Sequence, residues 1–161
     1  MEKTWTVRPI QTSDVTMIRT MVQETGVFRE SEVDVAVELA DSASKRKDDY
    51  QALVACHNDE VVGYSCFGPT PGTDRTFDLY WMVVSSYSHR KGVGTALLAT
   101  TEEQIRHLFG RLLVAETSGR PEYEPARNFY KRHGFRYEGR IPYFYADHDD
   151  KMFYVKTLRY G

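Results

Sequence analysis

The stretch Leu79-Tyr80-Trp81-Met82-Val83-Val84, followed after seven further residues by Gly92-Val93-Gly94-Thr95-Ala96-Leu97-Leu98, decides the fold of this chain. Its first part is an apolar run typical of a buried strand. Its second part opens a helix with apolar residues on one face, which Gly110 is well placed to end. A glycine turn here lets free backbone N–H groups at the helix start approach an anion. The stretch therefore predicts a phosphate-binding loop.

The glycine pair alone is weak evidence, because a tight turn without any ligand is the alternative. A dinucleotide-binding fingerprint would need Gly or Ala at the position of Leu97, and the chain has no Gly-x-x-x-x-Gly-Lys-Ser/Thr run. These two classes of nucleotide site are therefore excluded.

A second motif follows, Ala126-Arg127-Asn128-Phe129-Tyr130-Lys131-Arg132-His133-Gly134-Phe135. Together the two motifs resemble those of the GCN5-related N-acetyltransferase (GNAT) superfamily, at the spacing which that family uses. Two positions depart from its pattern. His89 stands where the family has Gln or Arg, and Tyr123 stands where an asparagine is often found.

Outside the motifs, the chain alternates between helical and extended periodicity. The first helix is capped by Thr12 or Ser13 and ends at Gly26, and a Ser31-x-x-Asp34 capping box opens the second. We expect a last helix at Pro125–Arg132 and strands at Thr4–Pro9, Gln51–His57, Val61–Gly68, Thr76–Val84, Arg111–Glu116, Arg136–Arg140 and Lys151–Leu158. The crossover helix makes the Arg111–Glu116 strand parallel to Thr76–Val84. The prediction is one mixed α/β domain over residues 1–161, a twisted, mostly antiparallel sheet with one parallel pair, flanked by helices.

Composition narrows the function classes further. The chain has 161 residues, with 21 Lys and Arg against 23 Asp and Glu, a net charge of −2. This balance argues against nucleic-acid binding and against attraction to an anionic membrane. The N-terminal residues lack the apolar core of a signal peptide and no apolar run is long enough for a membrane span, so we expect a cytoplasmic protein.

The potential metal ligands and thiols give no sign of a further site. The five histidines show no metal-ligand spacing, so no metal is expected. Hairpin pairing sets Cys56 opposite roughly Val61 and Cys66 opposite roughly Gln51, about 16 Å apart along the sheet. That distance is too long for a disulfide, so both thiols are expected to be free.

The resemblance implies acetyl-CoA as the cosubstrate. It implies that the pyrophosphate lies on the backbone of the glycine loop and that the strand before it is bulged, with N–H groups facing the pantetheine arm and the thioester oxygen. Asn128 is the candidate to replace the missing asparagine contact. The cofactor-binding residues expected are Met82, Val83, Val84, His89, Arg90, Lys91, Gly92, Val93, Gly94, Thr95 and Asn128.

Acetyl transfer to an amine also needs an acid and a base. Tyr130 stands where many family members place the acid that protonates the departing thiolate, although a tyrosine packed beside Phe129 is the alternative. An amine of pKa about 10 must lose a proton before it attacks, so a carboxylate is required. Glu116 is one candidate, at the carboxyl end of its strand. The resemblance implies the other, Asp78, which lies on the preceding strand where some family members carry a glutamate base. A solvated or ion-paired acid is the alternative for each.

The acceptor side is expected near the C-terminus, in a loop over Tyr143–Asp150 with Tyr123, Tyr143 and Tyr145 close by and Gly26–Arg29 as a rim. Arg120 and Arg127 are candidates to hold a substrate carboxylate, with plain surface roles as the alternative. These features predict direct acetyl transfer to a small polar amine or amino acid. A protein acetyltransferase and a non-catalytic CoA-binding sensor are the alternatives. The sequence leaves acyl-chain length and oligomeric state open, a homodimer being one possibility.

Overall fold

A computed structural model describes residues 5–88 and 92–158. Within these residues seven strands form one sheet in the order β1-β2-β3-β4-β5-β7-β6. The strands are β1 Trp5–Pro9, β2 Gln51–His57, β3 Glu60–Pro69, β4 Thr76–Val84, β5 Leu112–Ser118, β6 Arg136–Ala146 and β7 Asp149–Thr157. The helices are α1 Val15–Glu24, α2 Glu30–Ser44, α3 Val93–His107 and α4 Glu124–Arg132, with short 3-10 turns η1 Thr12–Asp14, η2 Ser86–Ser88 and η3 Pro121–Tyr123.

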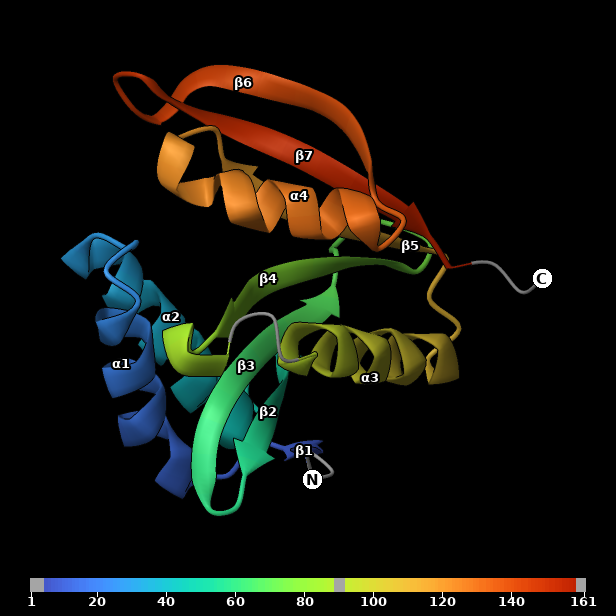
Figure 1. Cartoon of the computed structure of the whole chain (residues 1–161). Coiled ribbons are helices and arrows are strands. Elements are labelled where there is room, and N and C mark those ends of the chain that lie inside the picture. Colours follow the sequence, from blue (N-terminus) through green and yellow to red (C-terminus); the bar gives the residue numbers. More distant parts are fainter. Residues whose placement is uncertain (1–4, 89–91, 159–161) are drawn as a thin grey trace.

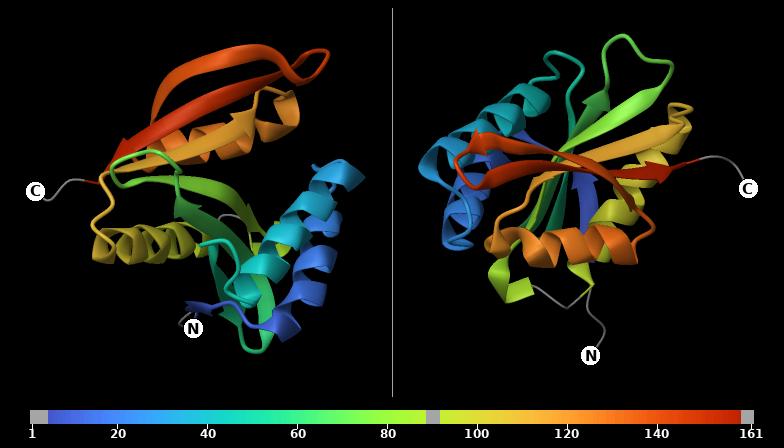
Figure 2. Two further views of the ribbon diagram at one scale, coloured as in Figure 1. Left: turned by 180° about the vertical axis from the view of Figure 1, so that it is seen from behind. Right: turned by 90° about the horizontal axis from the view of Figure 1, so that it is seen from above.

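Helices cover both faces of the sheet, α1 and α2 on one side and α3 and α4 on the other (Figure 1). The view from above in Figure 2 shows the same division. Each face has its own core. Ile18, Val22 and Tyr64 are fully buried in the α1–α2 core, and Leu97, Ile105 and Leu113 in the α3–α4 core. Alternate strand residues therefore point to two different compartments, which decides the face on which each site residue acts.

The predicted mixed sheet is confirmed: β4 and β5 are parallel and the other neighbouring strands are antiparallel. The bulge implied for β4 is also present. Cys66 pairs with Trp81 whereas Phe67 pairs with Leu79, so Tyr80 is an extra residue in β4. A bulge of this kind turns the strand and leaves local backbone groups unpaired.

Besides the predicted Thr12 or Ser13 cap, in whose place Asp14 is the N-cap of α1 while Thr12 and Ser13 lie in η1, two predicted boundaries were wrong. Helix α2 begins at Glu30, not after Ser31, and the Glu32 carboxylate accepts the Arg29 backbone N–H at 2.8 Å, so the cap lies two residues earlier than the Ser31-x-x-Asp34 box. The second error is the loop expected over 143–150. Strand β6 continues to Ala146 and β7 begins at Asp149. The register between the two strands is irregular from Ile141 to Ala146, but Ala146 pairs with Asp149 at a tight turn in which His148 has a φ of 60°.

The cysteine prediction is confirmed, since Cys56 and Cys66 are both free and buried. Cys56 pairs with Val61 as expected, whereas Cys66 lies opposite Ala52 and not Gln51, because a bulge shifts the register after Ala55. Among the residues that the structure describes, no helix is long and apolar enough to cross a membrane.

Candidate active site

The centre of the site is a fork between β4 and β5. The two strands pair from Thr76 with Leu112 to Leu79 with Ala115 and then part. The β4 bulge lies at the point of divergence. Figure 1 shows α4 and the β6–β7 hairpin on one side of this fork and α3 with β1–β3 on the other. A fork of this kind leaves backbone groups of the two strands free for a ligand.

The glycine loop ends at the N-terminus of α3. Gly92 is the N-cap with a φ of 84°, a left-handed conformation that favours glycine, and a Cβ there would meet nothing within 4 Å. Ala96 donates the first helical hydrogen bond, to the Gly92 carbonyl at 3.0 Å. The N–H groups of Val93, Gly94 and Thr95 precede it and have no intrahelical partner, which is the arrangement that binds a phosphate. The predicted contacts His89, Arg90 and Lys91 lie outside the described residues.

Helix α4 packs directly on this loop. A Cβ on Gly94 would lie 3.1 Å from the Phe129 ring, so glycine is required there for the close approach. Thr95 and His133 are joined by a hydrogen bond of 2.9 Å between Oγ1 and Nε2, and the Phe129 carbonyl lies 2.8 Å from His133 Nδ1. Since a carbonyl only accepts, Nδ1 carries a proton. His133 was missed from sequence, although it lies four residues after Phe129 and hence on the same helical face.

Tyr130 lies in the α3–α4 core and is only 7% exposed. Its ring packs against Phe135 and Tyr154, with centroids 5.1 and 6.2 Å away. No residue that the structure describes forms a hydrogen bond with its hydroxyl. Every side-chain N or O atom among these residues that is fully shielded from solvent does have a hydrogen-bond partner. The Tyr130 hydroxyl therefore keeps some contact with solvent. Burial raises the pKa of Tyr130, so the phenol remains protonated and able to donate.

Asn128 is a predicted cofactor contact that the structure turns away from Tyr130. Its side chain is exposed, and two residues along an α-helix turn by about 200°, so Asn128 faces away from Tyr130. In β4, by contrast, Met82 and Val84 pack on the α3–α4 core while Val83 is buried in the α1–α2 core.

The two candidate bases lie together on the α1–α2 face of the fork. Asp78 is half-buried and accepts a 2.8 Å hydrogen bond from Thr70 Oγ1. Desolvation raises the pKa of the Asp78 carboxyl and the Glu116 charge adds to this, while the Thr70 hydrogen bond opposes it. Glu116 is 39% exposed and pairs with Lys151 Nζ at 2.8 Å. The ion pair with Lys151 was not anticipated from sequence.

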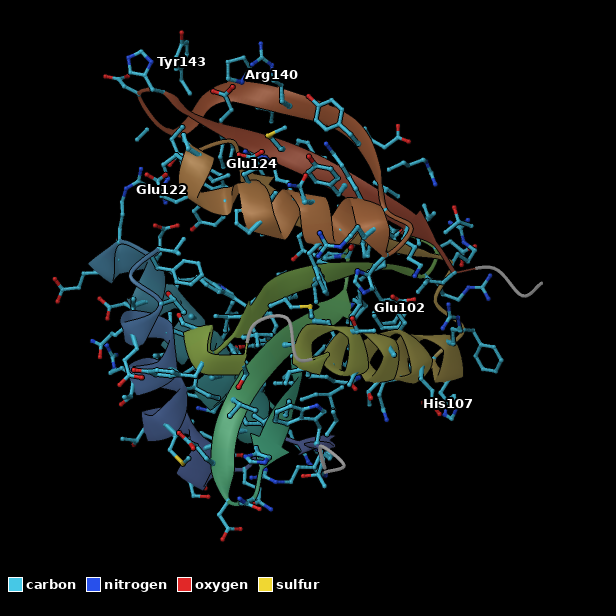
Figure 3. The ribbon with its side chains drawn as sticks, viewed as in Figure 1. Glu102, His107, Glu122, Glu124, Arg140 and Tyr143 are labelled. Carbon is cyan, nitrogen blue, oxygen red and sulfur yellow. The ribbon has the colours of Figure 1, made fainter. Side chains whose placement is uncertain are left out.

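Aromatic side chains connect the α1–α2 turn to β4 and η3. Phe28, from the α1–α2 turn, packs on Trp81 and Tyr123 with ring centroids 4.9 and 5.8 Å away. Phe28 of the predicted Gly26–Arg29 rim therefore contacts both β4 and η3. Tyr145 lies near Glu116, and burial raises its pKa to about 12. Tyr143, expected at the mouth, instead points into solvent from the outer edge of β6 (Figure 3).

An ion-pair network, which we call the strap, joins α2 to the far half of the sheet. Arg29 and Arg120 both pair with Asp149, at 2.7 and 3.3 Å, and Asp149 is 1% exposed. Glu32 accepts hydrogen bonds from Arg120 at 3.1 Å and from the Tyr123 hydroxyl at 2.8 Å. Ser118 donates a further hydrogen bond to Asp149.

The strap overturns one sequence expectation. Arg120 is engaged by Glu32 and Asp149, and Arg127 donates to the backbone carbonyls of Ser118 and Arg120 at 2.7 and 2.8 Å. Both guanidinium groups are therefore structural, and neither stands ready as a clamp for a substrate carboxylate.

The structure thus contains a glycine loop at the start of a helix, a bulged strand and a fork between two parallel strands. The family model described as an acetyltransferase (GNAT) domain matches residues 48–137, which is more than half of the chain. The chain belongs to the GNAT family of acetyltransferases.

Solved structures agree with this assignment. A protein from Desulfovibrio desulfuricans that is described as a member of the GNAT family is 39% identical, with a TM-score of 0.90 over 97% of this chain and 100% of that one. The ribosomal-protein-S18-alanine N-acetyltransferase of Escherichia coli is 17% identical, with a TM-score of 0.79 over 98% and 96% of the two chains. The PaiA N-acetyltransferase of Thermoplasma acidophilum, solved with coenzyme A, is 14% identical, with a TM-score of 0.74 over 96% and 99%. The last two show the fold alone. No curated protein matches the chain.

GNAT membership confirms the predicted class of enzyme, an acetyl-CoA-dependent N-acetyltransferase. Across residues 5–88 and 92–158 no three His, Cys, Asp or Glu side chains gather as metal ligands. A surface hollow of about 600 Å³ lies away from the fork, between the ends of β2, α2 and α3, and is lined by residues such as Leu53, Phe67 and Phe77. It contains neither motif, so it is not the GNAT site.

Proposed function

We propose that this enzyme moves the acetyl group of acetyl-CoA to the primary amine of a small polar molecule or an amino acid, by direct attack of the amine on the thioester. The strap is the observation that supports a small acceptor over a polypeptide. Arg29 and Glu32 bridge to Asp149 and Arg120 across one side of the acceptor face. Asp149 is 1% and Arg120 18% exposed, and the pairs that they form with Arg29 and Glu32 cross the side along which an extended polypeptide would have to lie.

The α3 N-terminus would hold the pyrophosphate through the free N–H groups that follow Gly92, with Thr95 beside them. The bound thioester supplies the activated acetyl group. The β4 bulge at Tyr80 would direct backbone N–H groups at the carbonyl oxygen, and a preorganised donor of this kind contributes about 3 kcal/mol of transition-state stabilisation.

Asp78 and Glu116 would bind the substrate ammonium and remove its proton. The amine nitrogen then forms the new bond to the acetyl carbon as the carbon–sulfur bond breaks. Tyr130 would give its hydroxyl proton to the departing thiolate from the α3–α4 side of the fork. Base and acid thus come from opposite faces of the sheet.

Direct attack is supported by the state of the two thiols. Burial raises the pKa of the Cys66 thiol to about 12 and also raises that of Cys56. A thiol needs to be a thiolate to act as a nucleophile. Neither cysteine therefore offers a covalent carrier for the acetyl group.

Acetyl transfer from acetyl-CoA to a panel of small amines, amino acids and short peptides tests the proposal, with thiol release as the readout. We expect release with one or more small amines and none with peptides. Release with peptides alone would instead make the enzyme a protein acetyltransferase. CoA binding without thiol release in a single turnover would favour the sensor alternative.

Each candidate base can be tested by an isosteric amide. Asp78→Asn and Glu116→Gln keep the shape of the site but cannot accept the ammonium proton, so loss of the base should lower kcat/KM about 30-fold at neutral pH. The loss should shrink towards about pH 9.5, because the fraction of unprotonated amine rises about tenfold per pH unit below its pKa. A pH–rate profile of both variants measures this.

The two amide variants control for each other. The acid that serves as the base shows the rescue at high pH, whereas an acid that only binds the ammonium gives a raised KM at every pH. If neither variant changes kcat/KM, the fork carboxylates are not part of the reaction.

A further inference from the structure

Lys151 is an unusual neighbour for a catalytic carboxylate. Its Nζ lies 2.8 Å from Glu116 Oε2, and the lysine side chain is only 16% exposed. It lies on β7, where it pairs with Ser118 of β5, so its position is set by the sheet register. No motif contains it, and the lysine is far from Glu116 in the sequence.

Two aromatic rings hold the lysine in place. Its Nζ lies 4.2 Å from the centroid of the Phe144 ring and 5.5 Å from that of Phe153. An ammonium within about 6 Å of a ring centroid is attracted by the ring quadrupole, which restricts a flexible lysine side chain. The ammonium is therefore held at the carboxylate and is not free to swing into solvent.

The charged groups around Glu116 make this contact consequential. Asp78 and Tyr80 face it from β4, Tyr145 from β6 and Lys151 from β7. The two carboxylates repel each other, and Lys151 is the cation that offsets this repulsion: the Lys151 charge lowers the pKa of Asp78 while the Glu116 charge raises it. Two close carboxylates without a cation tend to retain a proton between them.

We propose that Lys151 is a positioning residue of the acetyl-transfer site, whose ammonium holds Glu116 in place and offsets the negative charge that Glu116 sets beside Asp78. The proposal rests on the proposed function for its link to catalysis. The electrostatic part stands on the ion pair and the ring contacts alone.

Without the ammonium, Glu116 loses its ion-pair partner, and Asp78 loses a cation whose charge opposes that of Glu116, so the pKa of Asp78 rises. An opposite charge within about 4–6 Å shifts a carboxyl pKa by roughly one unit or more. The acid limb of the kcat/KM profile should therefore move up by about one pH unit in Lys151→Gln.

Lys151→Arg is the rescue variant, since it restores the charge, and its acid limb should move by less than about half a unit. Lys156→Gln is the matched control. Lys156 lies on the same strand and pairs with Glu102 of α3 at 2.8 Å, well away from the α1–α2 side (Figure 3). Its removal tests the loss of an ion pair that does not touch the fork, and thermal melting reports whether each variant is folded.

A second readout does not depend on turnover. Carboxyl ¹³C NMR titration of the free enzyme follows Asp78 directly, with Asp78→Asn used to assign its signal. We expect the Asp78 carboxyl to titrate at higher pH in Lys151→Gln and near the wild-type pH in Lys151→Arg and Lys156→Gln.

Unchanged titration in Lys151→Gln would overturn the proposal, as would an equal shift in Lys156→Gln. A shifted titration with no change in the acid limb would overturn the catalytic part. If no amine is acetylated by the wild type, the proposed function fails while the titration still decides whether Lys151 lowers the pKa of Asp78.

Discussion

Gly92→Asp should weaken CoA binding by roughly 100-fold, because it sets a carboxylate where a pyrophosphate is expected to meet the α3 N-terminus. The wild-type residue has a φ of 84°, and a Cβ there meets nothing within 4 Å. Aspartate and asparagine both tolerate this conformation and both cap helices well. Isothermal titration with CoA measures the affinity of each folded variant.

Gly92→Asn is the matched control, since it adds the same atoms without the charge. Its affinity should stay within about threefold of the wild type, because like-charge repulsion is absent. Equal affinities of the aspartate and asparagine variants would show that the pyrophosphate does not bind at the α3 N-terminus. Gly94 is the less informative position, because any side chain there meets Phe129 at 3.1 Å and disturbs packing as well as binding.

The central motif could be predicted from sequence because its signals are local. The apolar run of β4 has the observed bounds Thr76–Val84, and the helix after the glycines begins at Val93. The end of that helix was less well predicted. Phe109 takes the left-handed conformation with a φ of 61°, while Gly110 is needed because a Cβ would lie 2.3 Å from the Ile105 side chain. A left-handed conformation and a close approach to a neighbour both favour glycine. The sequence alone therefore does not show which of the two causes places glycine at position 110.

The acceptor side could not be predicted in the same way, because it is built from long-range pairs. Arg29 and Asp149 are 120 residues apart, and Glu32 and Arg120 are 88 apart. Taken one at a time in the sequence, each of these residues is typical of an ordinary surface charge. Their partners follow only from the register of β5 with β7 and from the approach of α2, which no local periodicity encodes.

The fork explains why the two kinds of residue are separated in the fold. Side chains of β4 and β5 alternate between faces, so Asp78 and Glu116 fall on the α1–α2 side whereas Leu79 and Ala115 join the α3–α4 core with Tyr130. The β4–β5 pairing ends at Leu79 and Ala115. In the function proposed above, an amine would lose its proton on one side of this fork and attack a thioester whose sulfur is protonated from the other.

Tyr130→Phe tests the acid on the α3–α4 side. The change removes one hydroxyl and keeps the ring that packs on Phe135 and Tyr154. If the phenol protonates the departing thiolate, kcat should fall about 100-fold, the lower end for general acid catalysis, because a thiolate is already a fair leaving group. CoA affinity should stay constant, since the interaction is made mainly in the transition state.

Tyr154→Phe is the control, because it removes a hydroxyl from the same aromatic cluster. Its kcat should be close to that of the wild type. The described residues offer the Tyr130 hydroxyl no partner, so Tyr130→Phe should change the free energy of unfolding by less than about 1 kcal/mol. Burial raises the pKa of Tyr130, so the wild-type phenol should remain protonated from about pH 6 to pH 9. The kcat of Tyr130→Phe should therefore stay below that of the wild type over this whole range. A Tyr130→Phe enzyme with full kcat over that range would leave Tyr130 a packing residue, and water would then be the source of the proton.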